Sequence, residues 1–419
     1  MGSEMCIRDS MTMAYNKQQK FLVAAVAFIV LLAIIYVVQE NRFEKILRTL
    51  SLSKKKRTVP KNENRKVVLI IGPGRSGTSL LGDLFNSRED FIYFFEPMKA
   101  IRTYHKMPQV TTIYQMQFML QETSEYMKDI ATCHYRKRND IYINLIHNKG
   151  MFWKKMQFLQ KQPFCNAETK GDENACKKQI IDSTIMNKMC KKLKKSTTIV
   201  IKELYKNFPY EDPSLMQFID MGEPKTFYVL HALRDPRAIL NSWRKLHWVT
   251  DEVRKDASKQ SDTLVPLFCG HMVKLLQNFP QAEGPNTVKY SIFRYDDIAF
   301  MDVENIARSL SQFLELKLEK DIKEYLTEKT QSTEDRKTAS LSLAPRNISL
   351  TINNWRKEIP MDLLESIENT DSCSVLMEML GYDKAITEDD LDDDQIQLVI
   401  DPLVNDVIGY SNNQHDDEQ

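Results

Sequence analysis

Residues Gly72 to Ser79, with the sequence GPGRSGTS, have the composition of a loop that binds a phosphate group. They follow an apolar run at 68–71 and open into a helix-like segment, an arrangement that directs backbone N–H groups and a helix N-terminus at an anion. An ATP- or GTP-binding loop would carry a lysine at the position of Thr78, where it reaches the β- and γ-phosphates. Here the cation is Arg75, inside the loop. The loop therefore predicts a nucleotide without a γ-phosphate.

A second segment, residues 226–246, predicts another phosphate contact. Its first eight residues are typical of a buried strand, and Arg234 follows that strand directly. Asp235 and Pro236 form a good N-cap and first-turn pair, so a helix should follow. Ser242 lies about two turns along that helix. A cation at a strand end and a hydroxyl on the next helix can together hold a phosphate separate from the one at the first loop.

The elements that must position these residues are those of an α/β domain. Strand-like runs recur at 67–71, 197–202, 226–233 and 287–293, with helical patterns between or after them. This alternation predicts a P-loop-like fold with a mainly parallel sheet flanked by helices. A long segment at about 104–195 is mostly helical in pattern and is expected to form an insertion beside the sheet.

The N-terminal region predicts a membrane anchor. Residues 21–38 form an uncharged run just long enough to span a bilayer, and no small-residue cleavage site follows it. Residues 1–20 would form a short cytoplasmic tail and residues 39–64 a polar, basic stem. Counting positive charges alone favours the opposite orientation, but a long downstream domain translocates regardless of them. Whether the first ten residues, MGSEMCIRDS, are native or artefactual stays open.

The overall charge limits the classes of partner. The chain has 58 basic and 57 acidic residues, a net charge of +1, and therefore no general nucleic-acid signature. Lysine-rich clusters at 54–57 and 191–195 are interpreted as solvated segments, although the second could attract an anionic glycan. The acidic end of the chain, 386–419, is predicted to be a flexible tail that follows a domain at 65–385.

The cysteines suggest an oxidising compartment. Six of the seven follow the predicted anchor: Cys133, Cys165, Cys176, Cys190, Cys269 and Cys373. An even set beyond an anchor predicts disulfides, although six cysteines allow 15 pairings, and six buried thiols in a cytosolic domain stay an alternative. None forms a CxxC pair, so a zinc site is not expected. Asn347, Ile348 and Ser349 make one glycosylation sequon, a triplet that also arises by chance.

Together these segments resemble the Golgi carbohydrate sulfotransferases, especially the branch that sulfates the 6-hydroxyl of galactose, N-acetylglucosamine or N-acetylgalactosamine. The resemblance covers most of residues 66–385. GPGRSGTSLLGDLFN is similar to the 5′-phosphosulfate loop of that family, and LHALRDPRAILNSW to its 3′-phosphate segment. These two motifs in this order are specific. FFEP at 94–97 is similar to the Glu-Pro element that follows the loop in the family.

Shorter elements add to the resemblance. FRYDDIA at 293–299 is similar to the Arg-Tyr-Glu-Asp-Leu element of the family, with Asp296 in place of Glu. Trp355 and the stretch CSVLMEMLGY at 373–382 fit its C-terminal pattern.

The resemblance implies that the donor is 3′-phosphoadenosine 5′-phosphosulfate (PAPS), which carries phosphate at two places and no triphosphate. Arg75 would lie against the 5′-phosphate and the bridging oxygen, while Arg234 and Ser242 would hold the 3′-phosphate. The other loop residues would supply N–H and hydroxyl donors: Gly72, Gly74, Ser76, Gly77, Thr78 and Ser79. A sulfuryl group carries less negative charge than a phosphoryl group, so no metal is expected.

The implied reaction is sulfuryl transfer to a sugar hydroxyl, most specifically a 6-hydroxyl, in the Golgi lumen. The enzyme would be a single-pass type II membrane protein, and its partner would be the glycan chain of a glycoprotein or proteoglycan. The sugar, its linkage and the oligomeric state stay open.

Glu96 is the first candidate for the base that takes the proton from that hydroxyl. It follows an apolar strand-like run and precedes Pro97, so it should lie at a strand end near the loop. The alternative is a purely structural carboxylate. Lys202, after the run TTIVI, is predicted to assist the sulfuryl group, with a surface lysine as the alternative.

Histidines are weaker candidates for the base. With seven in 419 residues, each is more simply explained as incidental: His105, His231, His247 and His271. We expect His231, within the strand before Arg234, to lie in the core or near the cofactor. Asp235 and Arg237 are interpreted as capping and salt-bridging residues.

Three rival interpretations remain. A P-loop kinase would need a loop lysine and an acidic strand end for magnesium, and the strand at 226–233 ends in arginine. A non-catalytic, membrane-anchored binding protein on the same scaffold would be expected to lose Arg75, Glu96, Arg234 or Ser242, and all four are present. The predicted anchor and luminal cysteines argue against a cytosolic sulfotransferase of small phenols or steroids.

Overall fold

The structure is a computed structural model of the 419-residue chain. It describes residues 65–104, 113–133, 135, 155–166, 168, 171–178, 184–194, 196–208, 226–246, 248–278, 287–331 and 344–384. All of them belong to the second of two units, Thr58–Gln419. The predicted tail, anchor, stem and acidic end lie outside the described residues. Within the described residues, no helix is both long and apolar enough to cross a bilayer.

A sheet of five parallel strands forms the centre of the domain, which confirms the predicted parallel α/β architecture. The strands have the order β2-β3-β1-β4-β5. Their bounds are β1 Val67–Gly72, β2 Phe91–Phe95, β3 Thr198–Leu204, β4 Thr226–Leu233 and β5 Thr287–Arg294. Every residue of β1, β2 and β3 is buried, as expected for strands that are covered on both faces.

The register brings the carboxyl ends of the strands to one edge. Gly72 of β1 pairs with Leu204 of β3, Phe95 of β2 pairs with Lys202, and Leu233 of β4 pairs with Arg294 of β5. The chain first builds β2 and β3 on one side of β1 and then β4 and β5 on the other. In open α/β sheets the crevice at such a switch of strand order is where ligands bind.

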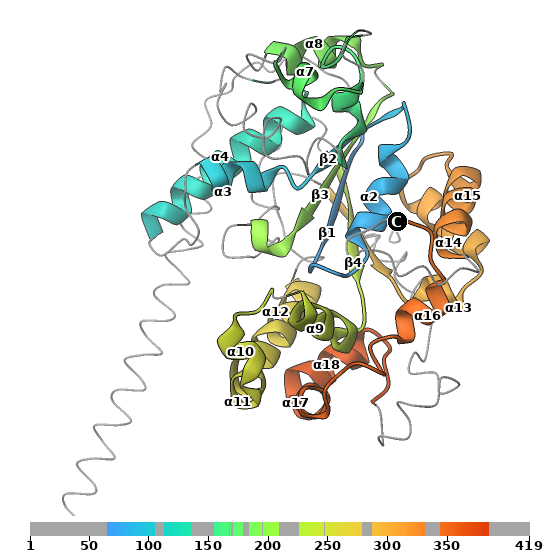
Figure 1. Cartoon of the computed structure of the whole chain (residues 1–419). Coiled ribbons are helices and arrows are strands. Elements are labelled where there is room, and N and C mark those ends of the chain that lie inside the picture. Colours follow the sequence, from blue (N-terminus) through green and yellow to red (C-terminus); the bar gives the residue numbers. More distant parts are fainter. Residues whose placement is uncertain are drawn as a thin grey trace, which may run out of the picture. The chain divides into compact units, whose positions relative to one another are not determined.

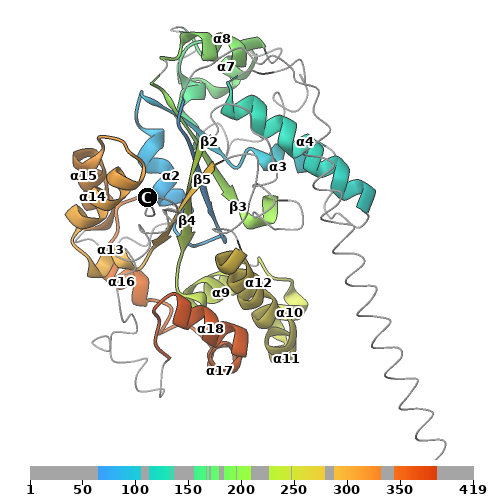
Figure 2. The same cartoon turned by 180° about the vertical axis from the view of Figure 1, so that it is seen from behind.

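Helices cover both faces of the sheet (Figures 1 and 2). On one side lie α2 Thr78–Asn86, α14 Val303–Phe313 and α15 Glu319–Thr330. On the other lie α3 Met98–Tyr104 and α4 Ile113–Ala131. The segment between α4 and β3 also contains η1 Gln157–Gln160, α7 Glu173–Lys178 and α8 Thr184–Lys192.

A second group of helices gathers at the carboxyl edge of the sheet (Figure 1). Its members are η2 Tyr205–Asn207, α9 Pro236–Lys245, α10 Asp251–Lys255, α11 Ala257–Lys259, the π-helical η5 Gln260–Leu264, α12 Val265–Asn278, α13 Asp297–Phe300, α16 Ile348–Asn353, α17 Met361–Asn369 and α18 Asp371–Met379. These helices surround the strand ends from which the predicted site residues emerge.

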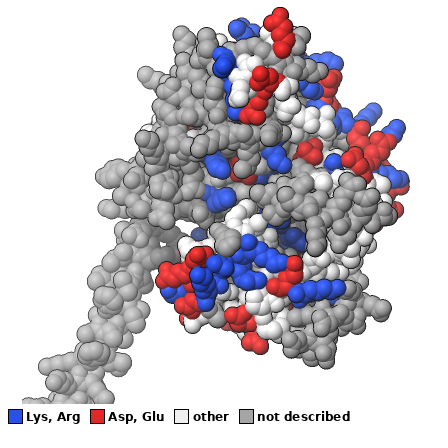
Figure 3. All heavy atoms as spheres, viewed as in Figure 1, with Lys and Arg blue, Asp and Glu red and all other residues white. Residues whose placement is uncertain are grey.

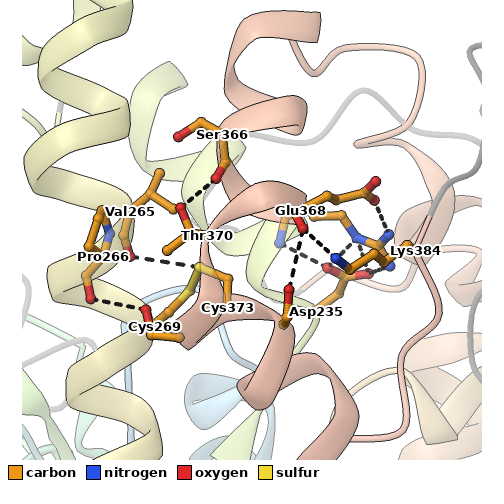
Figure 4. The surroundings of a disulfide bond; sticks show 12 residues. Asp235, Val265, Pro266, Cys269, Ser366, Glu368, Thr370, Cys373 and Lys384 are labelled. Atoms are coloured by element: carbon orange, nitrogen blue, oxygen red, sulfur yellow. Dashed lines mark hydrogen bonds and ion pairs between the residues drawn. A yellow bond between two sulfur atoms is a disulfide. The ribbon is translucent and has the colours of Figure 1, made fainter.

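Three disulfides join the six downstream cysteines and select one of the 15 pairings. They are Cys133–Cys190, Cys165–Cys176 and Cys269–Cys373. The last links α12 to α18 and closes a separation of 104 residues (Figure 4). In a chain-entropy model, a loop of that length stabilises the fold by about 5 kcal/mol. This crosslink therefore secures the C-terminal helices beside the carboxyl edge.

Candidate active site

The loop between β1 and α2 has an unusual backbone. Arg75 has a φ of 78° and Gly77, the N-cap of α2, has a φ of 93°. A left-handed conformation costs a non-glycine residue roughly 1–2 kcal/mol. Strain of this kind persists where the surroundings enforce it, and it concentrates at ligand sites. The loop is therefore held in one conformation around the N-terminus of α2.

Two aromatic side chains press against the loop. A Cβ atom added to Gly74 would lie 2.1 Å from a ring carbon of Trp248, and one added to Gly77 would lie 2.5 Å from the Tyr295 ring. Glycine is required at Gly77, where the positive φ and the buried Tyr295 ring both exclude a side chain, whereas at Gly74 the exposed Trp248 ring would have to shift. Sequence reasoning missed the role of Trp248, which no local motif indicates, and noted Tyr295 only as part of the FRYDDIA element.

The loop opens onto a cavity of about 670 Å³ at the carboxyl edge of the sheet. Nine of the predicted site residues line it: Gly74, Arg75, Gly77, Thr78, Ser79, Glu96, Lys202, Arg234 and Ser242. The volume falls within the range of small-molecule and cofactor sites, about 300–1,000 Å³. The structure thus brings together residues from β1, β2, β3, β4 and the segments that follow them.

The other two predicted loop residues support the loop from behind. A Cβ atom on Gly72 would lie 2.4 Å from the carbonyl oxygen of Ala232, so close packing of β1 on β4 requires glycine there. Ser76 is fully buried and donates a 2.8 Å hydrogen bond from its hydroxyl to the Pro73 carbonyl. Neither residue lines the cavity.

The cavity is strongly basic. Its lining includes nine lysines and arginines, namely Arg75, Lys99, Lys155, Lys202, Lys206, Arg234, Lys245, Lys329 and Arg346, but only two acids, Glu96 and Glu358. Figure 3 shows Lys and Arg side chains gathering on the face of the domain seen in Figure 1, in its lower half near α9. A concave site lined by one sign of charge raises the local concentration of ligands of the opposite sign.

Arg75 and Arg234 form the centre of one basic group. The Nε of Arg75 donates a 2.9 Å hydrogen bond to the Ser242 hydroxyl on α9. Arg234 donates to the Thr351 carbonyl at 3.0 Å and lies over the Tyr295 ring, 4.9 Å from its centre. Its buried Nε has no hydrogen-bond partner among the described residues. The Asp296 carboxylate lies 3.9 Å from this Nε, which is beyond hydrogen-bond distance.

The electrostatics of Arg75 also favour an anion. Burial lowers the pKa of Arg75, and repulsion from Arg234 and Arg346 lowers it further. A bound phosphate would relieve the repulsion, because its negative charge neutralises the charges that are crowded together. Sequence reasoning missed Arg346, which lies far from either phosphate motif and enters the site only through the tertiary fold.

Glu96 and Lys202, which also line the cavity, form a buried ion pair. Nζ of Lys202 donates to Oε1 of Glu96 at 2.6 Å, and the Glu96 backbone N–H donates to the Lys202 carbonyl at 2.7 Å. Lys202 is therefore no surface lysine: it is 1% exposed and lies over the Phe95 ring. The two residues meet because β2 and β3 are neighbours.

The charges around Glu96 keep its carboxylate ionised. Burial alone would raise the pKa of Glu96, but Lys202, Lys206 and Lys99 lower it below its ordinary value. For Lys202, burial lowers the pKa although Glu96 opposes that effect. The 2.6 Å contact is short even for a charge-assisted hydrogen bond. A carboxylate in this state can accept a proton at neutral pH.

The described histidines lie outside the cavity. His231 is fully buried in β4, where its two ring nitrogens contact the hydroxyls of Tyr205 and Tyr290. Burial lowers its pKa to about 3. The His271 ring stacks on the Tyr205 ring, with 6.0 Å between the ring centres. His105 and His247 fall outside the described residues, so the structure offers no histidine beside Glu96 among those it describes.

The start of α9 confirms the interpretation of Asp235 and Arg237. The Asp235 carboxylate accepts a 2.8 Å hydrogen bond from the backbone of Arg237 and pairs with its guanidinium. The same guanidinium, fully buried, also binds Glu368 of α17. These contacts anchor the helix that carries Ser242.

The FRYDDIA element supports Arg234. Asp296 accepts hydrogen bonds from the Asp235 backbone at 3.1 Å and from the Tyr382 hydroxyl at 2.5 Å. Its other oxygen lies 3.9 Å from Nε of Arg234. Burial raises the pKa of Asp296 although Arg234 opposes that shift. The element therefore joins the C-terminal segment to the arginine at the end of β4.

Comparison with known proteins agrees with this geometry. The family model for the sulfotransferase domain matches residues 65–371. Carbohydrate sulfotransferase 1 of Danio rerio is 22% identical over 374 residues, covering 81% of this chain and 83% of the relative. Carbohydrate sulfotransferase 1 of Mus musculus is 23% identical, covering 81% and 84%, and carbohydrate sulfotransferase 6 of Homo sapiens is 22% identical, covering 81% and 86%. The chain therefore belongs to the sulfotransferase domain family, with carbohydrate sulfotransferases among its relatives.

Proposed function

We propose that this protein transfers a sulfuryl group from PAPS to a hydroxyl of a glycan sugar, in particular a 6-hydroxyl. One observation supports this most: a single basic cavity holds the Arg75, Ser242 and Arg234 group together with the Glu96–Lys202 pair. The first group fits an anionic donor, and the second provides a proton acceptor beside it.

The donor would occupy the basic group. Arg75 and the N-terminus of α2 would bind the 5′-phosphate, with Gly77, Thr78 and Ser79 at the start of that helix. Arg234 and Ser242, which both line the cavity, would bind the 3′-phosphate. Arg75 and Arg234 follow different strands, β1 and β4. A donor with a phosphate at each of two places would use both arginines, as we propose for PAPS.

The Glu96–Lys202 pair would act on the acceptor. As the sugar oxygen forms its bond to sulfur, Glu96 takes the hydroxyl proton. The bond from sulfur to the bridging oxygen breaks, and its electrons stay on the 5′-phosphate, where Arg75 neutralises the developing charge. Because protonation of Glu96 removes the charge that faces Lys202, the ammonium becomes available to the sulfuryl oxygens during transfer.

The membrane topology belongs to the same proposal. Residues 21–38 would anchor a type II protein of the Golgi, with residues 65–385 in the lumen, where three disulfides are stable. The sequon fits a luminal domain: Asn347 is half-buried and caps α16, and Ser349 is exposed. Non-reducing peptide mapping should recover the three observed pairs. Six free thiols, or protease sensitivity of the domain in sealed vesicles, would reject this topology.

Sulfate transfer from radiolabelled PAPS to keratan, chondroitin and N-acetylglucosamine-terminated glycans tests the function directly. We expect transfer to at least one of these acceptors and none from ATP with magnesium. PAPS binding without transfer to any glycan would favour a non-catalytic binding protein. Phosphate transfer from ATP would favour a kinase. That outcome is not expected, because the position of the kinase lysine holds Thr78, which is buried.

A further inference from the structure

A second buried carboxyl group lies behind the Glu96–Lys202 pair. Glu203 follows Lys202 on β3 and is fully buried. Successive side chains of a strand point to opposite faces, so Glu203 leaves the sheet on the side away from Lys202. One of its oxygens accepts a hydrogen bond from the Met98 backbone at the start of α3, and the other accepts a 2.8 Å bond from the Asn207 amide.

Asn207 connects this carboxyl to the candidate base. Its amide nitrogen, Nδ2, lies 2.8 Å from Oε2 of Glu203 and 3.5 Å from Oε2 of Glu96. An amide nitrogen carries two hydrogens, so it can face both carboxyl groups at once. Lys202 binds the remaining oxygen of Glu96. The orientation of the Glu96 carboxyl is thus defined from two sides by buried groups.

The backbone at Glu96 needs this support. Its φ of 48° is left-handed, which costs a non-glycine residue roughly 1–2 kcal/mol. The Lys202 carbonyl fixes the chain at the Glu96 N–H, and Glu203 fixes it two residues later at Met98. A strained residue persists only where its neighbours determine its conformation.

We propose that Glu203 and Asn207 are positioning residues that hold the turn from Glu96 to Met98 and direct the Glu96 carboxylate into the cavity. This inference rests on the proposed function, in which Glu96 accepts the proton. Neither residue lines the cavity, so both act through Glu96 and not on the substrates.

The two hydrogen bonds that Glu203 accepts make one substitution informative. Burial raises the pKa of Glu203 to about 8, and the nearby Glu96 charge contributes to the shift. Both oxygens of Glu203 nevertheless accept hydrogen bonds from N–H donors, and Glu203→Gln preserves the size of the side chain. A glutamine, however, offers one accepting oxygen to two donors, the Met98 N–H and the Asn207 amide. One of these groups must lose its partner, which loosens the turn.

The experiment measures sulfate transfer by the full chain with Glu203→Gln introduced into the wild type and into Glu96→Gln. In the wild type we expect kcat to fall roughly 10²-fold, the usual effect of misplacing a reacting group by about 1 Å, with the acceptor KM and donor affinity within about twofold. In Glu96→Gln we expect no further loss, because the positioned group is already absent.

Glu315→Gln is a matched control. Glu315 also has a left-handed backbone, with a φ of 51°, and it pairs with Lys66 and Lys289 near the starts of β1 and β5, away from the cavity. We expect this variant to lower the melting temperature without changing kcat.

Two results would overturn the inference while leaving the sulfotransferase proposal intact: a wild-type kcat for Glu203→Gln, or equal losses in both backgrounds. If Glu203→Gln does not fold, Asn207→Ala decides instead, because it leaves the Met98 contact in place. The same non-additive loss is expected for it, and normal turnover contradicts the inference. Absence of transfer by the wild type to every glycan would reject the proposed function itself.

Discussion

The side chains of Arg75 and Ser242 are in direct contact, although 167 residues separate them: Nε donates a 2.9 Å hydrogen bond to Oγ. Arg75 follows β1 and Ser242 lies on α9, which follows the neighbouring strand β4. The indole N–H of Trp243 makes a second link, a 2.9 Å hydrogen bond to the Gly74 carbonyl. The two segments that predict separate phosphate contacts therefore meet in one site.

Ser242→Ala should weaken donor binding. The substitution removes a hydroxyl that orients Arg75 and that we propose to contact the 3′-phosphate. Hydrogen bonds to charged groups contribute about 1.5–3 kcal/mol, so the Kd for 3′-phosphoadenosine 5′-phosphate should rise at least about tenfold. Calorimetric titration measures this. Thr250→Ala, which removes the N-cap of the adjacent helix α10, is the control and should leave the Kd unchanged. An unchanged Kd for Ser242→Ala would argue against a role in binding.

Arg234→Ala should abolish selectivity for the 3′-phosphate. The wild type should bind 3′-phosphoadenosine 5′-phosphosulfate far more tightly than adenosine 5′-phosphosulfate, because only the former carries a 3′-phosphate for the Arg234 guanidinium, which lines the cavity. The variant should bind both with similar affinity, as competition assays would measure. Arg308→Ala, on the exposed surface of α14, should retain the wild-type selectivity. Selectivity that survives Arg234→Ala would place the 3′-phosphate elsewhere.

Gly77→Ala should destabilise the fold through two separate effects. The left-handed φ of 93° costs alanine roughly 1–2 kcal/mol, and overpacking against the buried Tyr295 ring typically adds about 1–3 kcal/mol. Gly171→Ala separates these effects, because Gly171 has a φ of 96° and nothing within 4 Å of the new Cβ atom. Denaturant unfolding should show the larger loss for Gly77→Ala. Equal losses would mean that Tyr295 yields without cost.

Glu96→Gln should remove turnover while preserving donor binding. Glutamine keeps the shape of the side chain but cannot accept the proton, and loss of a general base typically costs about 10²- to 10⁴-fold in rate. Donor affinity by calorimetry and sulfate transfer should be measured on the same preparation. Near-normal turnover would exclude Glu96 as the base. Loss of both donor affinity and sulfate transfer would identify Glu96 as a structural residue that holds Lys202.

His231 should make the stability of the fold depend on pH. Its folded-state pKa of about 3 lies below the unfolded value of about 6.5, so between these values the unfolded chain binds more protons. The contribution of His231 to stability is therefore fully present above about pH 6.5 and declines as the pH falls toward 3, by at most about 1.4 kcal/mol per pH unit. Urea unfolding of the wild type and of His231→Phe across this range measures the difference. Identical pH profiles would show that the pKa of His231 is the same in the folded and unfolded chain.

Local chemistry determined much of this protein. A run of β-branched residues favours a strand, glycines at fixed offsets favour a loop, and an Asp-Pro pair favours the start of a helix. These preferences are local, since backbone sterics and capping act over a few residues. The strand–loop–helix around the glycine-rich loop, the end of β4, the cap at Asp235 and the parallel sheet could therefore be predicted.

Only the tertiary structure decided which distant groups meet. Trp248 over Gly74, Arg346 beside Arg75 and the choice of cysteine partners all depend on how helices pack at one edge of the sheet. The same is true of the Glu96–Lys202 pair. It forms because β3 pairs with β2 and brings Lys202 beside the turn that carries Glu96. Contacts of this kind join residues far apart in the chain, and no local pattern specifies them.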